Sequence, residues 1–168
     1  MGVDPWALGR AAVQFVERRR IVSGGSTITM QVARLIEPRG ERTLSAKLRQ
    51  MVRAVQLEQR FSKDEIFDLY LTLTPFGGNL EGVRAASFAY FGKEPKRLSL
   101  AEAALLVALP QSPETRRLDR FPEAAKIARN RVLARMAALQ VASDDDVLAA
   151  RQDDVPRQRR SMPLLAAH

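Results

Sequence analysis

Residues Gly24 to Gln31 read Gly-Gly-Ser-Thr-Ile-Thr-Met-Gln, the most informative stretch of this chain. The two glycines permit positive φ and close backbone approach, and the hydroxyls of Ser26, Thr27 or Thr29 can cap the helix that follows. Unpaired N–H groups and the helix dipole converge at such a helix start, which favours a bound anion. An ordinary loop followed by a capped helix is the alternative interpretation of these residues.

Composition excludes several classes of function. The chain has 168 residues with 27 basic and 19 acidic side chains, so its formal net charge is +8. This excess favours anionic partners such as phosphates, nucleic acid or acidic lipid headgroups. Cysteine is absent and the single histidine is His168, so we expect no thiol chemistry, no histidine-based metal site and no Ser-His triad. The longest apolar run, residues 101–109, is about half the length of a membrane span.

Helical periodicity and capping residues predict an all-α chain with one domain. Helices are expected from Asp4 to about Arg19, from the Gly-Gly turn to about Pro38, from about Leu44 to Arg60, from Ser62, from Glu81 to Phe91, from Ser99, from Glu123 to about Leu139, and from Ser143. Ser62 to Glu65 and Ser99 to Glu102 have the spacing of capping boxes. From Arg151 onward, prolines and arginines indicate a linker or an extended tail.

The helix expected from Leu44 to Arg60 is amphipathic. Its apolar side chains recur at the helical period and form one stripe, made of Leu44, Leu48, Met51, Val52 and Val55. The helix that begins after Ser99 is instead apolar nearly all round, which is typical of a helix buried in the core.

A polar set on two neighbouring predicted helices is the strongest candidate for an anion site. It comprises Gln31, Arg34, Arg42, Lys47 and Gln50. Gln31 and Arg34 share one helix face at a spacing of three residues, and Lys47 and Gln50 repeat that spacing. Cations and amide donors that converge from different elements can hold a diphosphate. Two solvated faces of amphipathic helices would explain the same spacing.

The carboxylates are weaker candidates for functional residues than this polar set. Glu65 is accounted for by capping, Asp64 by the helix dipole, and Asp68 by pairing or exposure. Glu58 is a weak candidate for an acid or base, and a surface ion pair is the simpler expectation for it. No carboxylate pair with the placement found in glycosidases can be asserted from the sequence.

The motifs together resemble the glycosyltransferase domain of class A penicillin-binding proteins, the family 51 peptidoglycan glycosyltransferases, and most closely the 1C type. Residues 24–31 resemble the family motif Gly-Gly-Ser-Thr-Ile-Thr-Gln-Gln, with Met30 in place of the first glutamine. Residues 62–72 resemble Lys-x-x-Ile-Leu-Glx-x-Tyr-Leu-Asn, with Asp68 at the acidic position and Thr72 in place of asparagine. Residues 129–133 loosely resemble Arg-Arg-x-x-Val-Leu.

This resemblance implies a domain organisation and an activity. Residues 1–140 are expected to form a lysozyme-like, N-terminally truncated glycosyltransferase domain, and residues 141–168 a short helix and linker toward an absent transpeptidase domain. The implied activity is polymerisation of lipid II, a lipid-linked disaccharide-peptide, at the periplasmic face of the bacterial inner membrane, with an anchor outside this chain. Implied partners are lipid II, the growing glycan chain, the membrane surface and other cell-wall synthesis proteins. The resemblance allows Mg²⁺ or Mn²⁺ as a cofactor, although the residues themselves indicate no metal site.

The resemblance also implies roles for single residues. Gln31, Arg34, Arg42 and Lys47 match positions that hold the diphosphates of the two lipid-linked substrates. The substrate-cleft loop is matched by Gly24, Gly25, Ser26, Thr27 and Thr29. Gln50 stands where the family has a second glutamate, so it can donate and accept hydrogen bonds but cannot ionise. Only Gly2 matches the motif that holds the general-base glutamate, so we expect a fragment with impaired activity.

Two other functions stay open on these grounds. A non-catalytic module that binds lipid II or a membrane surface would keep the cations and need no general base. A basic nucleic-acid binder rests on net charge alone and is not expected, because the basic residues lie at the motif positions. Its binding would fall steeply with salt as phosphate contacts are lost.

Overall fold

The computed structural model describes residues 28–37 and 43–160. The helices in these ranges are α2 (Ile28–Ile36), α3 (Leu44–Arg60), α4 (Lys63–Leu73), α5 (Val83–Phe91), α6 (Leu100–Ala108), α7 (Pro122–Ala138) and α8 (Asp144–Gln152), with the 3₁₀ turns η1 (Pro95–Arg97) and η2 (Leu109–Gln111). Within them the only β-type pairing is an isolated bridge between Pro75 and Glu81. The all-α prediction is therefore confirmed, and the helix expected from Asp4 lies outside the described residues.

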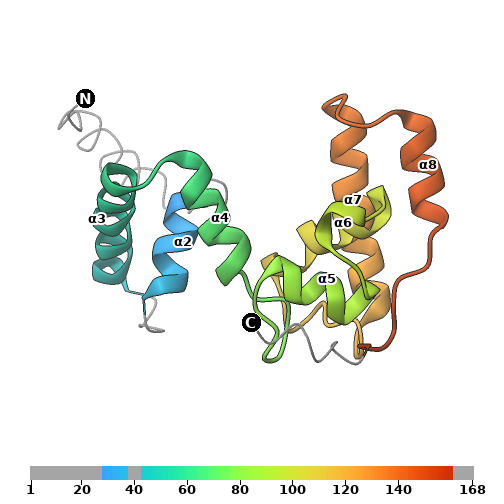
Figure 1. Cartoon of the computed structure of the whole chain (residues 1–168), viewed down its shortest axis with the longest axis horizontal. Coiled ribbons are helices and arrows are strands. Elements are labelled where there is room, and N and C mark those ends of the chain that lie inside the picture. Colours follow the sequence, from blue (N-terminus) through green and yellow to red (C-terminus); the bar gives the residue numbers. More distant parts are fainter. Residues whose placement is uncertain (1–27, 38–42, 161–168) are drawn as a thin grey trace.

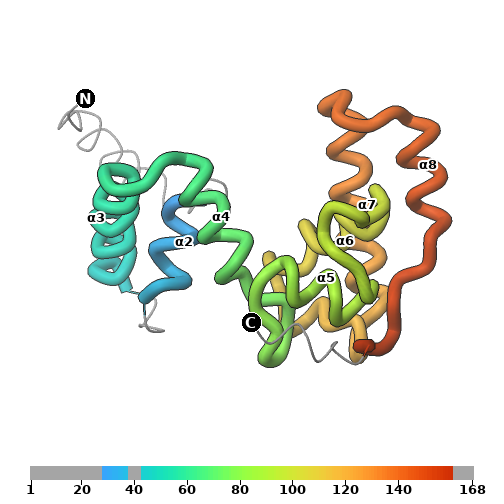
Figure 2. The backbone as a smooth tube through the Cα atoms, in the orientation of Figure 1, coloured from blue at the N-terminus to red at the C-terminus, as the bar shows by residue number. Residues whose placement is uncertain are grey.

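The described helices form two groups (Figure 1). One group contains α2, α3 and α4, and the other contains α5 to α8. The backbone tube in Figure 2 shows that the segment after α8 turns back past the end of α7 toward α5. No helix within the described ranges is long and apolar enough to cross a membrane.

Two helices begin at the capping boxes that the sequence predicts. At the start of α4, the Ser62 backbone N–H donates to Glu65 Oε2 at 2.8 Å, and the Glu65 N–H donates to Ser62 Oγ at 3.3 Å. Ser99 and Glu102 repeat this exchange at the start of α6, with distances of 2.7 and 3.3 Å. Each box satisfies backbone donors that the first helical turn leaves unpaired.

Glycines set both ends of α5. The helix begins at Val83, later than the expected Glu81, because Gly82 has φ of +84° and its N–H donates to Thr74 O at 2.9 Å. A Cβ at Gly82 would lie 2.8 Å from Thr72 O, so this turn excludes a side chain. Gly92, with φ of +73°, ends the helix as predicted.

The core lies in the α5–α8 group. One cluster gathers apolar residues of α5, α6 and the loops around them, and Tyr90 within it donates its hydroxyl to Phe76 O at 2.9 Å. A second cluster joins α6, α7 and α8, and it consists of Ala101, Ala104, Leu133, Val147 and Ala150. The burial expected for α6 is confirmed for most of its residues, although Val107 is 65% exposed.

The apolar stripe of α3 faces away from the helices that pack against it. Leu44, Leu48 and Val52 are 72%, 60% and 52% exposed, whereas the small residues Ala46 and Ala54 are buried. Alanine allows α3 to approach its neighbours closely, and the bulky side chains then point outward. An amphipathic helix usually buries its apolar stripe, so this arrangement differs from what the periodicity predicts.

The segment after α8 packs against the domain instead of extending as a tail. Arg151 and Gln152 still belong to α8, which corrects the expectation that the helix stops before them. Farther on, Val155 joins the core cluster, and the Arg160 N–H donates to Ala89 O at 2.7 Å. We call residues 153–160 the strap. The domain boundary at residue 140 stays a prediction, but α8 and the strap share the core of α5–α7.

Candidate substrate-binding site

Four of the predicted diphosphate-site residues lie on two helices that pack against each other. Gln31 and Arg34 lie on α2, and Lys47 and Gln50 lie on α3. The first three are exposed and Gln50 is half-buried, so their polar groups can reach a ligand from solvent. Arg42 and the loop residues Gly24, Gly25, Ser26 and Thr27 lie outside the described residues. The convergence of the four side chains on one ligand stays a prediction.

The amino-terminal turns of α2 and α3 carry no acidic side chain. Among the other described helices, α5 also lacks an acidic residue in its first turn, whereas α4, α6, α7 and α8 each have at least one. Such residues complement the positive end of a helix, which is otherwise available to an external anion. At the start of α3, Thr43 Oγ1 accepts from the Ala46 N–H at 3.2 Å, and Lys47 follows in the same turn. This end of α3 therefore favours anionic ligands.

Thr29 has a structural role that the sequence does not predict. It lies inside α2 and is only 7% exposed, so it neither caps the helix nor stands open to a cleft. Its Oγ1 donates to Glu58 Oε1 on α3 at 2.9 Å. Glu58 thus accepts a hydrogen bond across the α2–α3 contact, where we expected a surface ion pair. A second contact joins the helices where Arg53 Nε lies 3.6 Å from Glu37 Oε1.

Three of the cavities formed by the described residues are lined by side chains other than Gln31, Arg34, Lys47 and Gln50. Two of them, of about 590 and 500 Å³, lie along α2 and α3 beside Arg53 and Gln56. The third, of about 680 Å³, lies between the strap and α5–α7. No group of three or more His, Cys, Asp or Glu side chains in the described ranges is placed to hold a metal ion.

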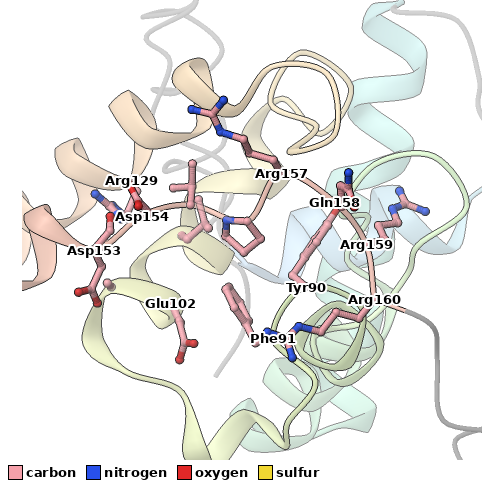
Figure 3. Close-up of a pocket in the computed structure, with 14 residues that line it drawn as sticks. Tyr90, Phe91, Glu102, Arg129, Asp153, Asp154, Arg157, Gln158, Arg159 and Arg160 are labelled. Atoms are coloured by element: carbon pink, nitrogen blue, oxygen red, sulfur yellow. Dashed lines mark hydrogen bonds between the residues drawn. The ribbon is translucent and has the colours of Figure 1, made fainter.

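Arg129 is the important residue whose environment the sequence does not reveal. It is 1% exposed, and Figure 3 shows it at the end of the cavity beneath the strap. Its guanidinium donates to Asp153 O at 2.6 Å and to Arg151 O at 3.0 Å, and two further bonds of 3.1 Å reach Asn130 Oδ1. Burial lowers the pKa of Arg129, while the charges of Asp153 and Asp154 oppose that shift. In the sequence, only the loose match of residues 129–133 to a family motif drew attention to Arg129.

Arg159 fastens the other end of the strap. Its Nη2 donates to Gly77 O at 2.7 Å and its Nη1 to Asn79 Oδ1 at 3.3 Å. The same turn is held from a second loop, because Glu114 Oε1 accepts from the Gly78 N–H at 2.8 Å. The strap therefore connects α7 with the turn between α4 and α5.

Comparisons with known proteins identify relatives of this chain. The Transglycosylase family model matches residues 1–137. Penicillin-binding protein 1C of Escherichia coli (strain K12) is 51% identical over 98% of this chain and 21% of its own length. Penicillin-binding protein 1A of Aquifex aeolicus (strain VF5) is 45% identical over 80% of this chain and 19% of its own. The chain thus spans about a fifth of the length of these curated relatives.

A solved structure shares the fold. The crystal structure of penicillin-binding protein 1A from Haemophilus influenzae superposes with a TM-score of 0.54 at 23% identity. The superposition covers 86% of this chain and 19% of that one. It supports the expected glycosyltransferase fold for the described helices.

Proposed function

The chain belongs to the transglycosylase family, and on this premise we propose that it is the domain of a cell-wall enzyme that polymerises lipid II into glycan strands. The observation that carries the proposal is the family match over residues 1–137, which includes both helices of the candidate site. The relatives at 51% and 45% identity are penicillin-binding proteins, which supports the same assignment. The domain would act at the periplasmic face of the inner membrane.

In this proposal α2 and α3 bind the diphosphates of the two lipid-linked substrates. Arg34 and Lys47 supply positive charge, and Gln31 supplies an amide donor. The acid-free amino end of α3 adds backbone N–H groups and the positive end of its dipole. Arg42 precedes that end in the sequence and would extend the positive surface. Gln50 would donate a hydrogen bond through its amide, since it cannot take up a proton.

The reaction forms a bond between the acceptor 4-hydroxyl oxygen and the donor anomeric carbon, with inversion at that carbon. The bond from the anomeric carbon to the lipid diphosphate breaks, and its electron pair leaves with the diphosphate. Cations preorganised at α2 and α3 would stabilise this developing charge. The hydroxyl proton passes to a general base. By resemblance that base is a glutamate of the family motif of which this sequence contains only the final glycine, Gly2.

Binding of lipid II in detergent micelles tests the site. Replacing Arg34 and Lys47 together by alanine removes two charged contacts, each worth about 1.5–3 kcal/mol, so affinity should fall roughly 100-fold or more. The matched control replaces the exposed Arg131 and Arg135 of α7 by alanine and removes the same charge. We expect the control to bind within about twofold of the unmodified chain. Equal weakening of both variants would contradict a diphosphate site on α2 and α3.

Polymerisation of labelled lipid II is a second test. Because this sequence holds only Gly2 of the general-base motif, we expect the unmodified chain to bind lipid II and to form few or no glycan strands. Placing the family's Glu-Asp-x-x-Phe-x-x-His motif ahead of Gly2 then separates the two main functions. Glycan strands from that variant, lost again on replacement of Arg34 and Lys47, support the glycosyltransferase. Continued binding without strands supports the alternative, a non-catalytic lipid II or membrane-surface module that shares the cationic helices. Absence of both binding and strands would overturn the two proposals together.

A further inference from the structure

One short turn, residues 74–82, joins the two helix groups, and we call it the connecting turn. Within the described ranges the chain passes from the α2–α4 group to the α5–α8 group only here (Figure 1). A bridge between Pro75 and Glu81 closes the turn, and the Gly82 N–H donates to Thr74 O at 2.9 Å. A short connection of this kind can act as a hinge, because a few residues absorb the change in φ and ψ. The orientation of α2 and α3 therefore depends on how the connecting turn is held.

Three elements hold the connecting turn against the α5–α8 group. Tyr90 of α5 and Glu114 of the loop before α7 each bond to one backbone group of the turn, at 2.9 and 2.8 Å. The third element is the strap, whose Arg159 donates to Gly77 O at 2.7 Å and to Asn79 Oδ1 at 3.3 Å. Hydrogen bonds from a charged guanidinium are stronger than those between neutral groups, so Arg159 makes a large contribution to holding the turn.

Arg159 is itself fixed to the α5–α8 group by the rest of the strap. The next residue, Arg160, donates its N–H to Ala89 O of α5 at 2.7 Å, and Val155 lies in the core. In Figure 3 the side chains of Arg159 and Arg160 leave the strap in different directions, and that of Arg160 extends toward Phe91. The backbone of the strap is thus bound to α5, while the Arg159 side chain is bound to the connecting turn.

Two features weaken the contact between Arg159 and the connecting turn. Arg159 Nε is buried and has no hydrogen-bond partner among the described residues. A Cβ at Gly78 would lie 3.2 Å from Arg159 Nη2 and 3.8 Å from Arg117 Nη1, so two guanidinium groups surround this glycine. Arg117 pairs with Asp119 at 2.6 Å, whereas no ion pair joins Arg159 to a carboxylate of the described ranges. An unpaired buried donor and a nearby like charge both oppose the contact, which makes it easier to break.

We propose that Arg159 is a positioning residue that latches the connecting turn and so fixes the α2–α4 group relative to the α5–α8 group. While the latch is closed, Arg34 and Lys47 keep one orientation relative to α5–α8. When Arg159 leaves the turn, the α2–α4 group can pivot about residues 74–82 with both groups still folded. The latch operates for any ligand of α2 and α3, and only its consequence for lipid II rests on the proposed function.

Hydrogen exchange at single amides tests the latch, with Arg159→Met as the variant and Arg157→Met as the matched control. Arg157 lies in the same strap, but its side chain is 77% exposed and lies 3.7 Å from Glu123. The Leu80 and Gly82 amides of the connecting turn should exchange roughly tenfold faster or more in Arg159→Met, because the loss of a charged donor lets the turn open more often. Amides inside α7 should keep their rates in both variants.

Distances between spin labels test the orientation itself, since the chain has no natural cysteine that would also be labelled. Gln59→Cys on α3 and Ala134→Cys on α7 report on both groups, and Ala134→Cys with Leu148→Cys on α8 reports on one group alone; all three positions are exposed. Arg159→Met should broaden the first distance distribution and leave the second unchanged. Arg159→Lys should restore much of the narrow distribution, because an ammonium can still donate to Gly77 O.

The proposal is overturned if Arg159→Met and Arg157→Met give the same exchange rates in the connecting turn and the same distances between α3 and α7. It is also overturned if the amides of α7 accelerate as much as those of the turn, because Arg159 would then stabilise the whole fold. Both measurements are made without lipid II, so their failure is distinct from a failure of the proposed function.

Discussion

Replacement of Arg129 by methionine tests whether the buried guanidinium holds the strap to the domain. The arginine is 1% exposed and donates to the backbone oxygens of Arg151 and Asp153. Methionine keeps most of the aliphatic volume and removes every donor, so the change isolates the hydrogen bonds from the packing. The two carbonyl groups then lose their charged partner.

The expected cost follows from those two bonds. A hydrogen bond to a charged group contributes about 1.5–3 kcal/mol, which gives about 3–6 kcal/mol for both. Relief of the buried charge offsets part of this loss, because desolvation of Arg129 already disfavours its charged form. We therefore expect the free energy of unfolding to fall by about 3 kcal/mol. Arg129→Lys should cost less, since an ammonium can retain one of the bonds.

Urea denaturation followed by circular dichroism measures this difference, and Arg131→Met is the matched control. Arg131 is exposed on the same helix, so its replacement should change stability by less than about 0.5 kcal/mol. Limited trypsin digestion provides a local readout, because Arg157, Arg159 and Arg160 lie in the strap. Cleavage there should accelerate in Arg129→Met. Equal stability of the Arg129 and Arg131 variants, with unchanged strap cleavage, would refute the reasoning.

Three further substitutions test which local contacts stabilise the fold. Gly82→Ala should cost about 1–3 kcal/mol in denaturant melts, because φ is +84° and the new Cβ would lie 2.8 Å from Thr72 O; an unchanged midpoint contradicts this. Ser62→Ala should cost about 1 kcal/mol through loss of the α4 cap, and a neutral result would show that the box adds nothing. Burial opposes ionisation of Glu102, but bonds from Lys93 and Ser99 outweigh it and lower its pKa. Glu102 therefore stabilises the fold above the unfolded carboxyl pKa of about 4.3, and this contribution is lost as pH falls through the lowered folded value. Stability measured from pH 7 to acid should fall less steeply in Glu102→Gln, and an identical slope would exclude the effect.

Local sequence signals were reliable where neighbouring residues satisfy the backbone. Ser62 and Ser99 each lie three residues before a glutamate, and both boxes form as predicted. Gly92 ends α5 for the same kind of reason, because glycine adopts positive φ without steric cost. Such features depend on contacts within one helical turn. The order of the helices could therefore be predicted without knowledge of the tertiary structure.

The side on which a helix packs depends on distant residues. Periodicity identified the apolar stripe of α3, yet the residues that this helix buries are Ala46 and Ala54, and the helices that contact it are α2 and α4. The loose motif at residues 129–133 did not reveal the burial of Arg129, because two of its partners are backbone oxygens more than twenty residues away, those of Arg151 in α8 and Asp153 in the strap. Thr29 likewise depends on Glu58 across the helix pair.

The sequence alone thus determined the all-α class and the capped helix starts. It also carries the family motifs, and the site residues Gln31, Arg34, Arg42, Lys47 and Gln50 stay a prediction from them. Those properties arise from residue type and short spacing, which the chain carries in any environment. Only the tertiary structure decided that the strap packs onto the core, that Arg129 is buried and that the α3 stripe faces outward. Each of these depends on which surfaces meet, and burial of a polar or apolar group is a property of the assembled fold.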